Sequence, residues 1–169
     1  MSLLIVLRLI HVLSGIFWAG GVFFIAGHLI PAVRDAGPEG AKVMQALQRR
    51  HVLEIFPAAA VLTILSGLWL YWRDAAGNPR WGRTPMGMSL GLGALCAVLG
   101  FIIGVFVMRA ATIRAGRLAA ALDGMAQGPE KDARAALIQR LRLRAAVSAR
   151  WVAALLGLAA AAMAVARYA

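Results

Sequence analysis

The sequence predicts an all-α fold: an integral membrane up-down-up-down four-helix bundle made of two helical hairpins, with long cytoplasmic helix extensions. The chain of 169 residues is 62% hydrophobic, well above the roughly 45–50% apolar content of soluble domains. Four long runs contain no Asp, Glu, Lys or Arg, and the basic residues gather in two of the connections. We expect one transmembrane domain, residues 1–169, with helices at about 3–33, 38–73, 85–123 and 129–168.

The first helix is predicted by the uncharged run from Leu9 to Val33. A helix needs roughly 20 apolar residues to cross the hydrocarbon of a bilayer, so this run is long enough. It is also too long and too rich in Gly and Trp for a signal peptide, and no small-residue cleavage site follows it. We therefore expect no cleaved signal peptide and a chain that keeps Met1.

The second and fourth helices are predicted to begin in the connections, before the membrane. Gly37-Pro38-Glu39 and Gly128-Pro129-Glu130 each offer a proline suited to a first helical turn and an acid for the positive end of the helix dipole. From each motif the pattern runs into an apolar stretch, and Pro57 is the one breaker on the way. The recurrence of this motif suggests that the two hairpins form a weak parallel repeat.

The third helix is predicted by the uncharged run from Thr84 to Met108 and should continue past it to a stop near Gly124. The run from Trp151 to Ala166 is shorter, and it spans if the flanking arginines extend to the two interfaces. The single cysteine, Cys96, lies within the third helix, where we expect it to serve packing.

The distribution of basic residues predicts the orientation. The connections after the first and third helices carry thirteen Lys and Arg residues, and the opposite side carries five. Because Lys and Arg near helix ends are retained in the cytoplasm, we expect a multi-pass protein of the bacterial inner (cytoplasmic) membrane with N- and C-termini periplasmic. The net charge of +11 then reflects topology and contact with anionic membrane lipids. No nucleic acid is expected as a partner.

The most informative polar residue of the first helix is His11. Ser14, Gly15, Trp18 and Val22 follow it at spacings of three and four, so the five residues share a face. Gly15 would leave bare backbone for a flat macrocycle, and Trp18 would form an aromatic wall or an interface anchor. An unpaired polar ring buried in lipid costs on the order of 1–3 kcal/mol, so His11 is either a metal ligand or hydrogen-bonded to a backbone carbonyl or Ser14.

A resemblance to known families lies in the first two helices. His11 is followed after six residues by Trp18-Ala19-Gly20, and the second helix reads RRHVLEIFPAAAVLTILSGLWL from Arg49 to Leu70. These stretches resemble the membrane families around the HemJ-type protoporphyrinogen oxidase and the copper-resistance protein D. The resemblance implies a small membrane protein that binds haem b and handles electrons or a tetrapyrrole, with His11 as the haem or metal ligand.

One departure from the HemJ pattern bears on the chemistry. The HemJ type has an essential lysine at the outer end of the third helix, whereas the segment WGRTPMGMSLGLG has Arg83, Met86 and Met88 there. A thioether can neither pair with a propionate nor act as a base, which argues against protoporphyrinogen oxidation. Met86 or Met88 could instead be a soft axial ligand beside His11 or contact Cu(I). The alternative is that both methionines are ordinary apolar filler.

A second proposal concerns His28, at the inner end of the first helix, and His51, at the inner start of the second. A hairpin would bring them to one depth, where they could face each other across a haem. Glu54 could orient the ring of His51 or pair with Arg50. The alternative is that both histidines are ordinary headgroup-boundary residues.

Two classes of function follow, together with a copper-handling variant of the first. In the first class, the chain is a haem-binding redox protein for electron transfer or tetrapyrrole chemistry, with copper as the runner-up cofactor. In the second, it is a non-catalytic accessory or assembly subunit of a larger membrane complex, joined to membrane protein partners or to further copies through small-residue faces such as GLGALCAVLG. Whether it is an enzyme is left open.

Overall fold

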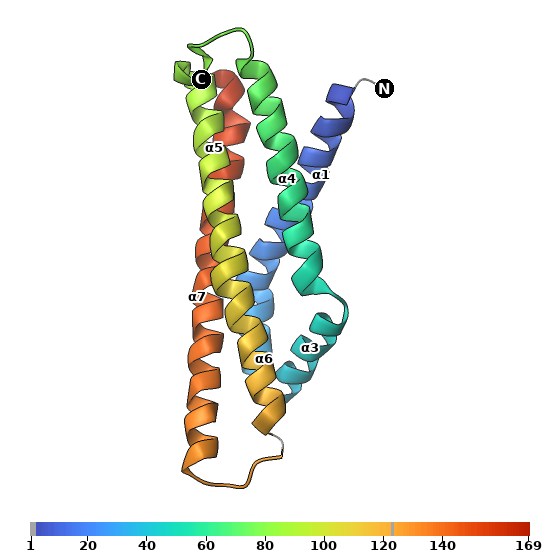
Figure 1. The fold of residues 1–169 in the computed structure, drawn as a ribbon, viewed down its shortest axis with the longest axis vertical. Helices are drawn as coiled ribbons and strands as arrows, with labels where there is room; N and C mark the ends of the chain where they lie inside the picture. Colours follow the sequence, from blue (N-terminus) through green and yellow to red (C-terminus); the bar gives the residue numbers. More distant parts are fainter. Residues whose placement is uncertain (1–2, 123) are drawn as a thin grey trace.

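The computed structural model describes residues 3–122 and 124–169, and the described residues form helices joined by short connections, with no strand among them (Figure 1). Four helical stretches are long and apolar enough to cross a membrane: Leu3–Asp35, Val52–Ala75, Pro85–Leu122 and Pro129–Tyr168. The prediction of an all-α fold with four helices long and apolar enough to span a membrane is confirmed.

Two of these stretches contain a π-helical segment that the sequence analysis did not predict. The first stretch is α1 (Leu3–Phe24), the π-helical η1 (Ile25–Leu29) and α2 (Ile30–Asp35). The third is α5 (Pro85–Ile102), the π-helical η3 (Ile103–Arg109) and α6 (Ala110–Leu122). The fourth is α7 (Pro129–Val165) with the 3-10 turn η4 (Ala166–Tyr168), and another 3-10 turn, η2 (Trp81–Arg83), precedes α5.

The predicted starts of the third and fourth helices are confirmed, and each has a local cause. Thr84 caps α5, because its Oγ1 accepts a hydrogen bond from the backbone N–H of Gly87 at 3.1 Å. Pro129 opens α7, where Glu130 receives a hydrogen bond from Arg134 one turn later at 2.8 Å. The third and fourth helices therefore extend beyond their apolar runs, as predicted.

The prediction of one helix over 38–73 is wrong. The structure divides this range into α3 (Gly37–Arg49) and α4 (Val52–Ala75), because His51 adopts a left-handed conformation with φ 57° that an α-helix cannot contain. α3 instead packs back on α2, and Gly40 lies so close to the carbonyl of Val33 that a side chain there would overlap it. The second long helix thus begins at Val52, shortly before its apolar run, while α3 lies beside the lower part of the bundle (Figure 1).

Pro57 lies inside α4 without ending it. Proline lacks an N–H, so the carbonyl of Leu53, four residues earlier, loses its helical donor. The Nε of Arg109 donates to that carbonyl at 3.0 Å. A guanidinium from the end of η3 therefore replaces the missing backbone hydrogen bond and ties the second and third membrane helices together.

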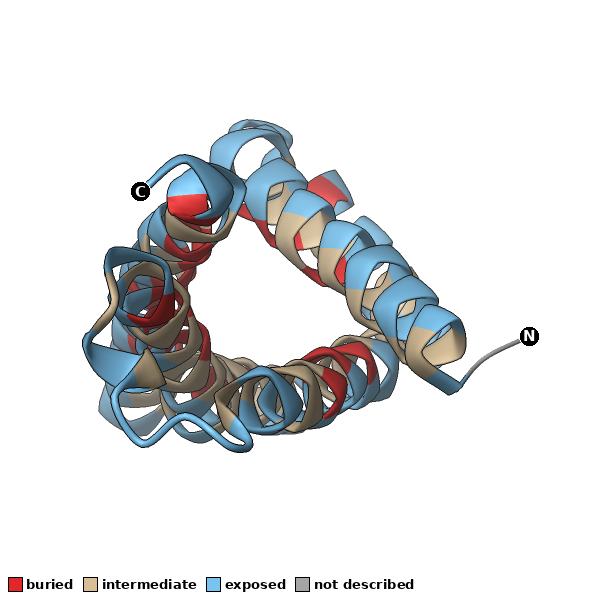
Figure 2. Ribbon diagram, turned by 90° about the horizontal axis from the view of Figure 1, so that it is seen from above, coloured by how far each residue is buried: buried red, intermediate tan, exposed pale blue. Residues whose placement is uncertain are grey.

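The core is built from small residues and lies between the helices. α1 packs mainly against α4, and α5 packs against α7; buried positions line the inward faces while the outward faces are exposed (Figure 2). A second cluster under the α6–α7 extension contains Ala111, Ala115, Ile138, Leu141 and Ala145. Cys96 is buried in the main cluster, as predicted. The outward apolar side chains suit contact with lipid.

The close approach of α5 and α7 predicts a stability difference between two glycines. A Cβ on Gly93 would lie 3.0 Å from Cγ of Met163 and 3.1 Å from the carbonyl oxygen of Ala159, whereas one on Gly20 would meet nothing within 4 Å. We expect Gly93→Leu to destabilise the protein by about 1–3 kcal/mol through overpacking. Gly20→Leu, the matched control, should have no such cost. Thermal unfolding in detergent micelles measures the stability of both variants. Equal midpoints would contradict the close packing of α5 against α7.

Candidate cofactor site

His11 is held against α4 by a hydrogen bond to the main chain. Its Nδ1 lies 2.8 Å from the carbonyl oxygen of Thr63 and 3.5 Å from Oγ of Ser66. A carbonyl oxygen can only accept, so Nδ1 carries the proton that it donates to Thr63. In the neutral ring the lone pair is then on Nε2. The sequence analysis left open a carbonyl or Ser14 as partner of this ring, and the partner is a carbonyl of the neighbouring helix.

Ser14 takes part in the polar contacts between α1 and α4 but forms no hydrogen bond with the His11 ring. The Thr63 hydroxyl donates to Oγ of Ser14 at 2.8 Å, and it also lies 2.8 Å from the carbonyl oxygen of Ala59. Oγ of Ser14 donates in turn to the carbonyl of Ile10. Thr63 and Ser66 are both buried, so a line of hydrogen bonds joins α1 to α4 where no water needs to enter.

Gly67 makes the position of the imidazole sterically feasible. A Cβ there would lie 2.6 Å from Cε1 and 2.9 Å from Nδ1 of His11, so any side chain would collide with the ring. Sequence reasoning assigned this glycine no role. A signal was present, because Thr63, Ser66 and Gly67 occupy one face of the second apolar run at helical spacing.

A cavity of about 350 Å³ opens beside His11 between α1, α4 and α5. Its walls are mostly apolar, and its polar or polarisable lining groups are Arg8, His11, Thr63, Tyr71, Asp74, Met86 and Met163. This volume falls within the range of about 300–1,000 Å³ that is usual for small-molecule sites. The cavity lies toward the end of the molecule where both termini are found (Figure 1).

The second ring nitrogen of His11 is accessible, and the ring lines this cavity. Among residues 3–122 and 124–169, Nε2 has no hydrogen-bond partner, and no buried side-chain N or O atom lacks one. Nε2 is therefore accessible rather than sealed in the core. An imidazole whose Nδ1–H is fixed by a carbonyl and whose Nε2 faces open space has the arrangement of a typical metal-ligating histidine.

Gly15 and Trp18 do not serve the roles predicted for them. The Cα of Gly15 faces α4, and a Cβ there would lie 3.4 Å from Cγ2 of Thr63, so Gly15 allows two helices to approach rather than a macrocycle. Trp18 is 5% exposed and packs in the main core cluster with Val22. Helical spacing correctly placed both residues on the face of α1 that carries His11. From His11 toward the C-terminal end of α1, that face packs against α4 and α7.

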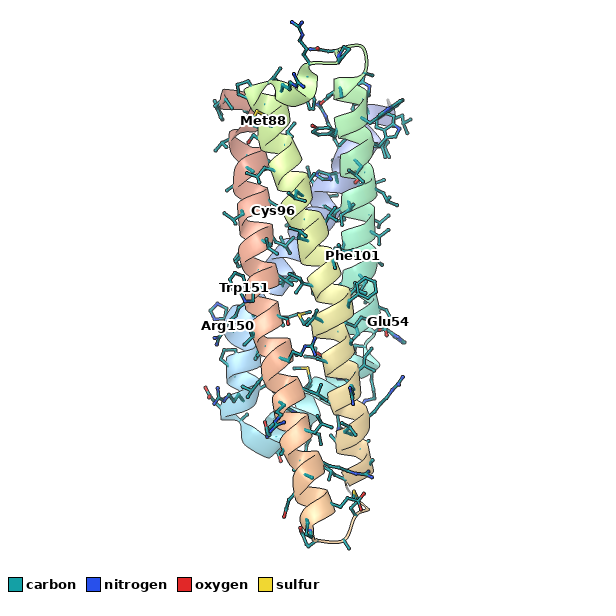
Figure 3. The ribbon with its side chains drawn as sticks, turned by 60° about the vertical axis from the view of Figure 1, so that its left-hand side comes forward. Glu54, Met88, Cys96, Phe101, Arg150 and Trp151 are labelled. Carbon is teal, nitrogen blue, oxygen red and sulfur yellow. The ribbon has the colours of Figure 1, made fainter. Side chains whose placement is uncertain are left out.

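The methionines divide between the cavity and the surface. Met86 lines the cavity with His11. Met88 is 62% exposed and is not part of the lining (Figure 3). Met163 of α7 also lines the cavity, and sequence reasoning missed it because nothing in the alanine-rich fourth run marks its orientation.

His28 and His51 are placed far less favourably for a ligand role. Both are exposed. His28 lies in η1 with its ring centroid 6.1 Å from that of Phe24, and His51 occupies the left-handed turn before α4. No ring contact or hydrogen bond joins the two histidines within the described chain. Their predicted pairing across one haem gains no support from this arrangement.

Glu54 lies near His51, as expected, but its second partner is Arg109 rather than Arg50. Its Oε1 lies 3.8 Å from Nη2 of Arg109, and its Oε2 lies 3.9 Å from Nδ1 of His51. The expected contact with His51 is present at long range, whereas the expected pairing with Arg50 is replaced by Arg109. This exchange follows from the break at His51, which takes Arg50 out of the helix that carries Glu54.

Searches against protein-family models, curated proteins and solved structures find no match. In the part of the chain that is described, no group of three or more His, Cys, Asp or Glu side chains could hold a metal ion. The candidate site is therefore a single imidazole at an apolar cavity, with thioethers in the same wall.

The contact between His11 and Gly67 predicts a coupling between two substitutions. Gly67→Ala should destabilise the protein by about 1–3 kcal/mol, because its methyl group displaces the ring and breaks the hydrogen bond to Thr63. In a His11→Ala background the same change should cost little, since the space is free. A double-mutant cycle of thermal or denaturant unfolding measures this coupling. Additive effects would show that the ring does not lie against Gly67.

Proposed function

We propose that this chain is a haem b-binding integral membrane protein with a redox role, in which His11 supplies an axial ligand through Nε2. The observation that carries the proposal is the hydrogen bond from Nδ1 to the carbonyl of Thr63, which leaves the basic nitrogen at Nε2 of a ring that lines the cavity. Outer hydrogen bonds of this kind fix the tautomer of a ligating histidine and raise its basicity. Bound haem would supply one-electron chemistry at this position.

The cavity residues fit a porphyrin by their chemistry. Apolar side chains such as Leu68, Leu90 and Val98 line the walls and exclude water. Arg8 and Asp74 are the charged groups of the lining, and Arg8 can neutralise an acidic substituent of a macrocycle. Met86 and Met163 offer thioethers that suit a second axial position. Because no lysine is among the residues that line the cavity, we favour electron transfer over protoporphyrinogen oxidation.

Copper is the second candidate, for one specific reason. His11, Met86 and Met163 line the same cavity, and an imidazole with two thioethers is a soft donor set of the kind that selects Cu(I). In this alternative the chain handles copper and binds no tetrapyrrole. The resemblance of the first two helices to copper-resistance protein D agrees with this alternative, as the HemJ resemblance agrees with haem.

The haem proposal predicts a Soret band from the purified protein and a pyridine haemochrome spectrum of the b type. His11→Gly should lose the band because the ligand nitrogen is gone, and added imidazole should restore it by occupying the vacated space. His28→Ala and His51→Ala are the matched controls and should retain wild-type absorbance. Metal analysis of the same samples separates haem iron from copper.

A colourless protein, purified from cells supplied with haem and without retained copper, would contradict both cofactor proposals. Stoichiometric membrane proteins in that preparation would favour the accessory-subunit alternative. A Soret band that survives His11→Gly but disappears in His51→Ala would move the site to the opposite end of the bundle.

We further propose that the four spans cross a bacterial inner membrane up-down-up-down, with both termini periplasmic. Asn78 and Gln127 are exposed in the short connections at opposite ends of the molecule. In intact cells Asn78→Cys should react with a membrane-impermeant maleimide, whereas Gln127→Cys should react only after permeabilisation. Cys96 is buried and should contribute little background. The reverse labelling pattern would invert the topology.

A further inference from the structure

A second hollow lies far from the cofactor cavity, between the third and fourth membrane helices. It has a volume of about 110 Å³. Its lining includes Phe106, Val107, Arg114 and Arg144 together with smaller apolar side chains. Phe106 and Val107 belong to the π-helical η3, Arg114 to α6 and Arg144 to α7. π-helical segments occur frequently at functional sites, which gives this irregularity a reason to exist.

The two arginines of this groove have no acidic partner in the described residues. The ion pairs of that part of the chain involve Lys42, His51, Arg109 and Arg134. Arg114 and Arg144 come from different helices and line one groove, and among residues 3–122 and 124–169 neither forms an ion pair. Two guanidinium groups lining one hollow suit a phosphate group by their chemistry, because guanidinium binds phosphate through paired N–H donors.

The depth of the groove points to a lipid phosphate. Arg109 is the first charge after the third apolar run, and Arg114 lies five residues farther, about 7.5 Å along a helix. Trp151, 64% exposed, begins the fourth apolar run next to Arg150 (Figure 3), and Arg144 lies about two turns before it. The polar layer on each side of a bilayer is roughly 5–7 Å thick. By this measure the backbone of Arg114 lies at the outer edge of the headgroup layer and that of Arg144 a few ångströms beyond it, so the phosphate must be met by the long side chains rather than at the level of their backbones.

The apolar side of the groove faces the hydrocarbon. Phe106 is 69% exposed and precedes Arg109, so it lies within the apolar run. From these features we propose that the groove binds one anionic phospholipid, with its phosphate between Arg114 and Arg144 and an acyl chain along Phe106 and Val107. A free phosphate would use the guanidinium groups alone and gain nothing from the aromatic wall.

Native mass spectrometry of the full-length protein tests this proposal with dioleoylphosphatidylglycerol and dioleoylphosphatidylcholine as probes. We expect one phosphatidylglycerol to be retained in preference to phosphatidylcholine. Arg114→Gln and Arg144→Gln should each raise its dissociation constant about fivefold, the effect of one basic residue near an anionic surface. Phe106→Ala should also weaken retention, through the lost acyl contact. Thermal unfolding without added lipid verifies that each variant is folded.

Arg117→Gln and Arg142→Gln are the matched controls. Each substitution removes one positive charge from α6 or α7 at an exposed position outside the groove. They should change the dissociation constant less than twofold. Equal weakening by all four arginine variants would show diffuse attraction and overturn the site. Displacement of the lipid by millimolar inorganic phosphate, with no effect of Phe106→Ala, would overturn the lipid in favour of a free anion.

Discussion

The seam between α1 and α4 depends on one constraint: inside a membrane a polar group must find its partner within the protein. Thr63 meets this constraint for both helices, because its hydroxyl reaches Ser14 while its carbonyl accepts from His11. The same rule explains Arg109, which donates to the carbonyl of Leu53 that Pro57 leaves without a donor. In the described part of the chain, no buried side-chain N or O atom lacks a partner.

The cofactor cavity follows from the way the helices pair. Glycines let α1 approach α4 and let α5 approach α7, as Gly15 and Gly93 show by the side chains that face them. Tight association within each pair leaves the space between the pairs to be filled by larger side chains. Toward the terminal end α1 diverges from α5 and α7 (Figure 1), and the residues there do not fill the gap. The opening beside His11 is the result.

The sequence predicted the features that depend on composition over many residues and missed those that depend on single contacts. Apolar runs were sufficient for four spans, and Pro129 marked the start of α7 because helix initiation is local chemistry; the start of α5 followed from its apolar run, and the cap by Thr84 was seen only in the structure. The break at His51 has no Gly or Pro to announce it, and it arises from the packing of α3 on α2. His11 and Met86 were identified by residue type, whereas Gly67 and Met163 owe their roles to neighbours that are distant in sequence.

The two nitrogens of His11 separate a structural role from a ligand role. For packing alone, the hydrogen bond from Nδ1 to Thr63 would be sufficient, and an apolar side chain would fill the seam without needing any partner. The imidazole also has an accessible Nε2 without a hydrogen-bond partner among the described residues, and His11 lines a mostly apolar cavity. A bound metal centre would use the lone pair that the Thr63 hydrogen bond leaves on Nε2. The ligand role thus accounts for both nitrogens with one conformation of the ring.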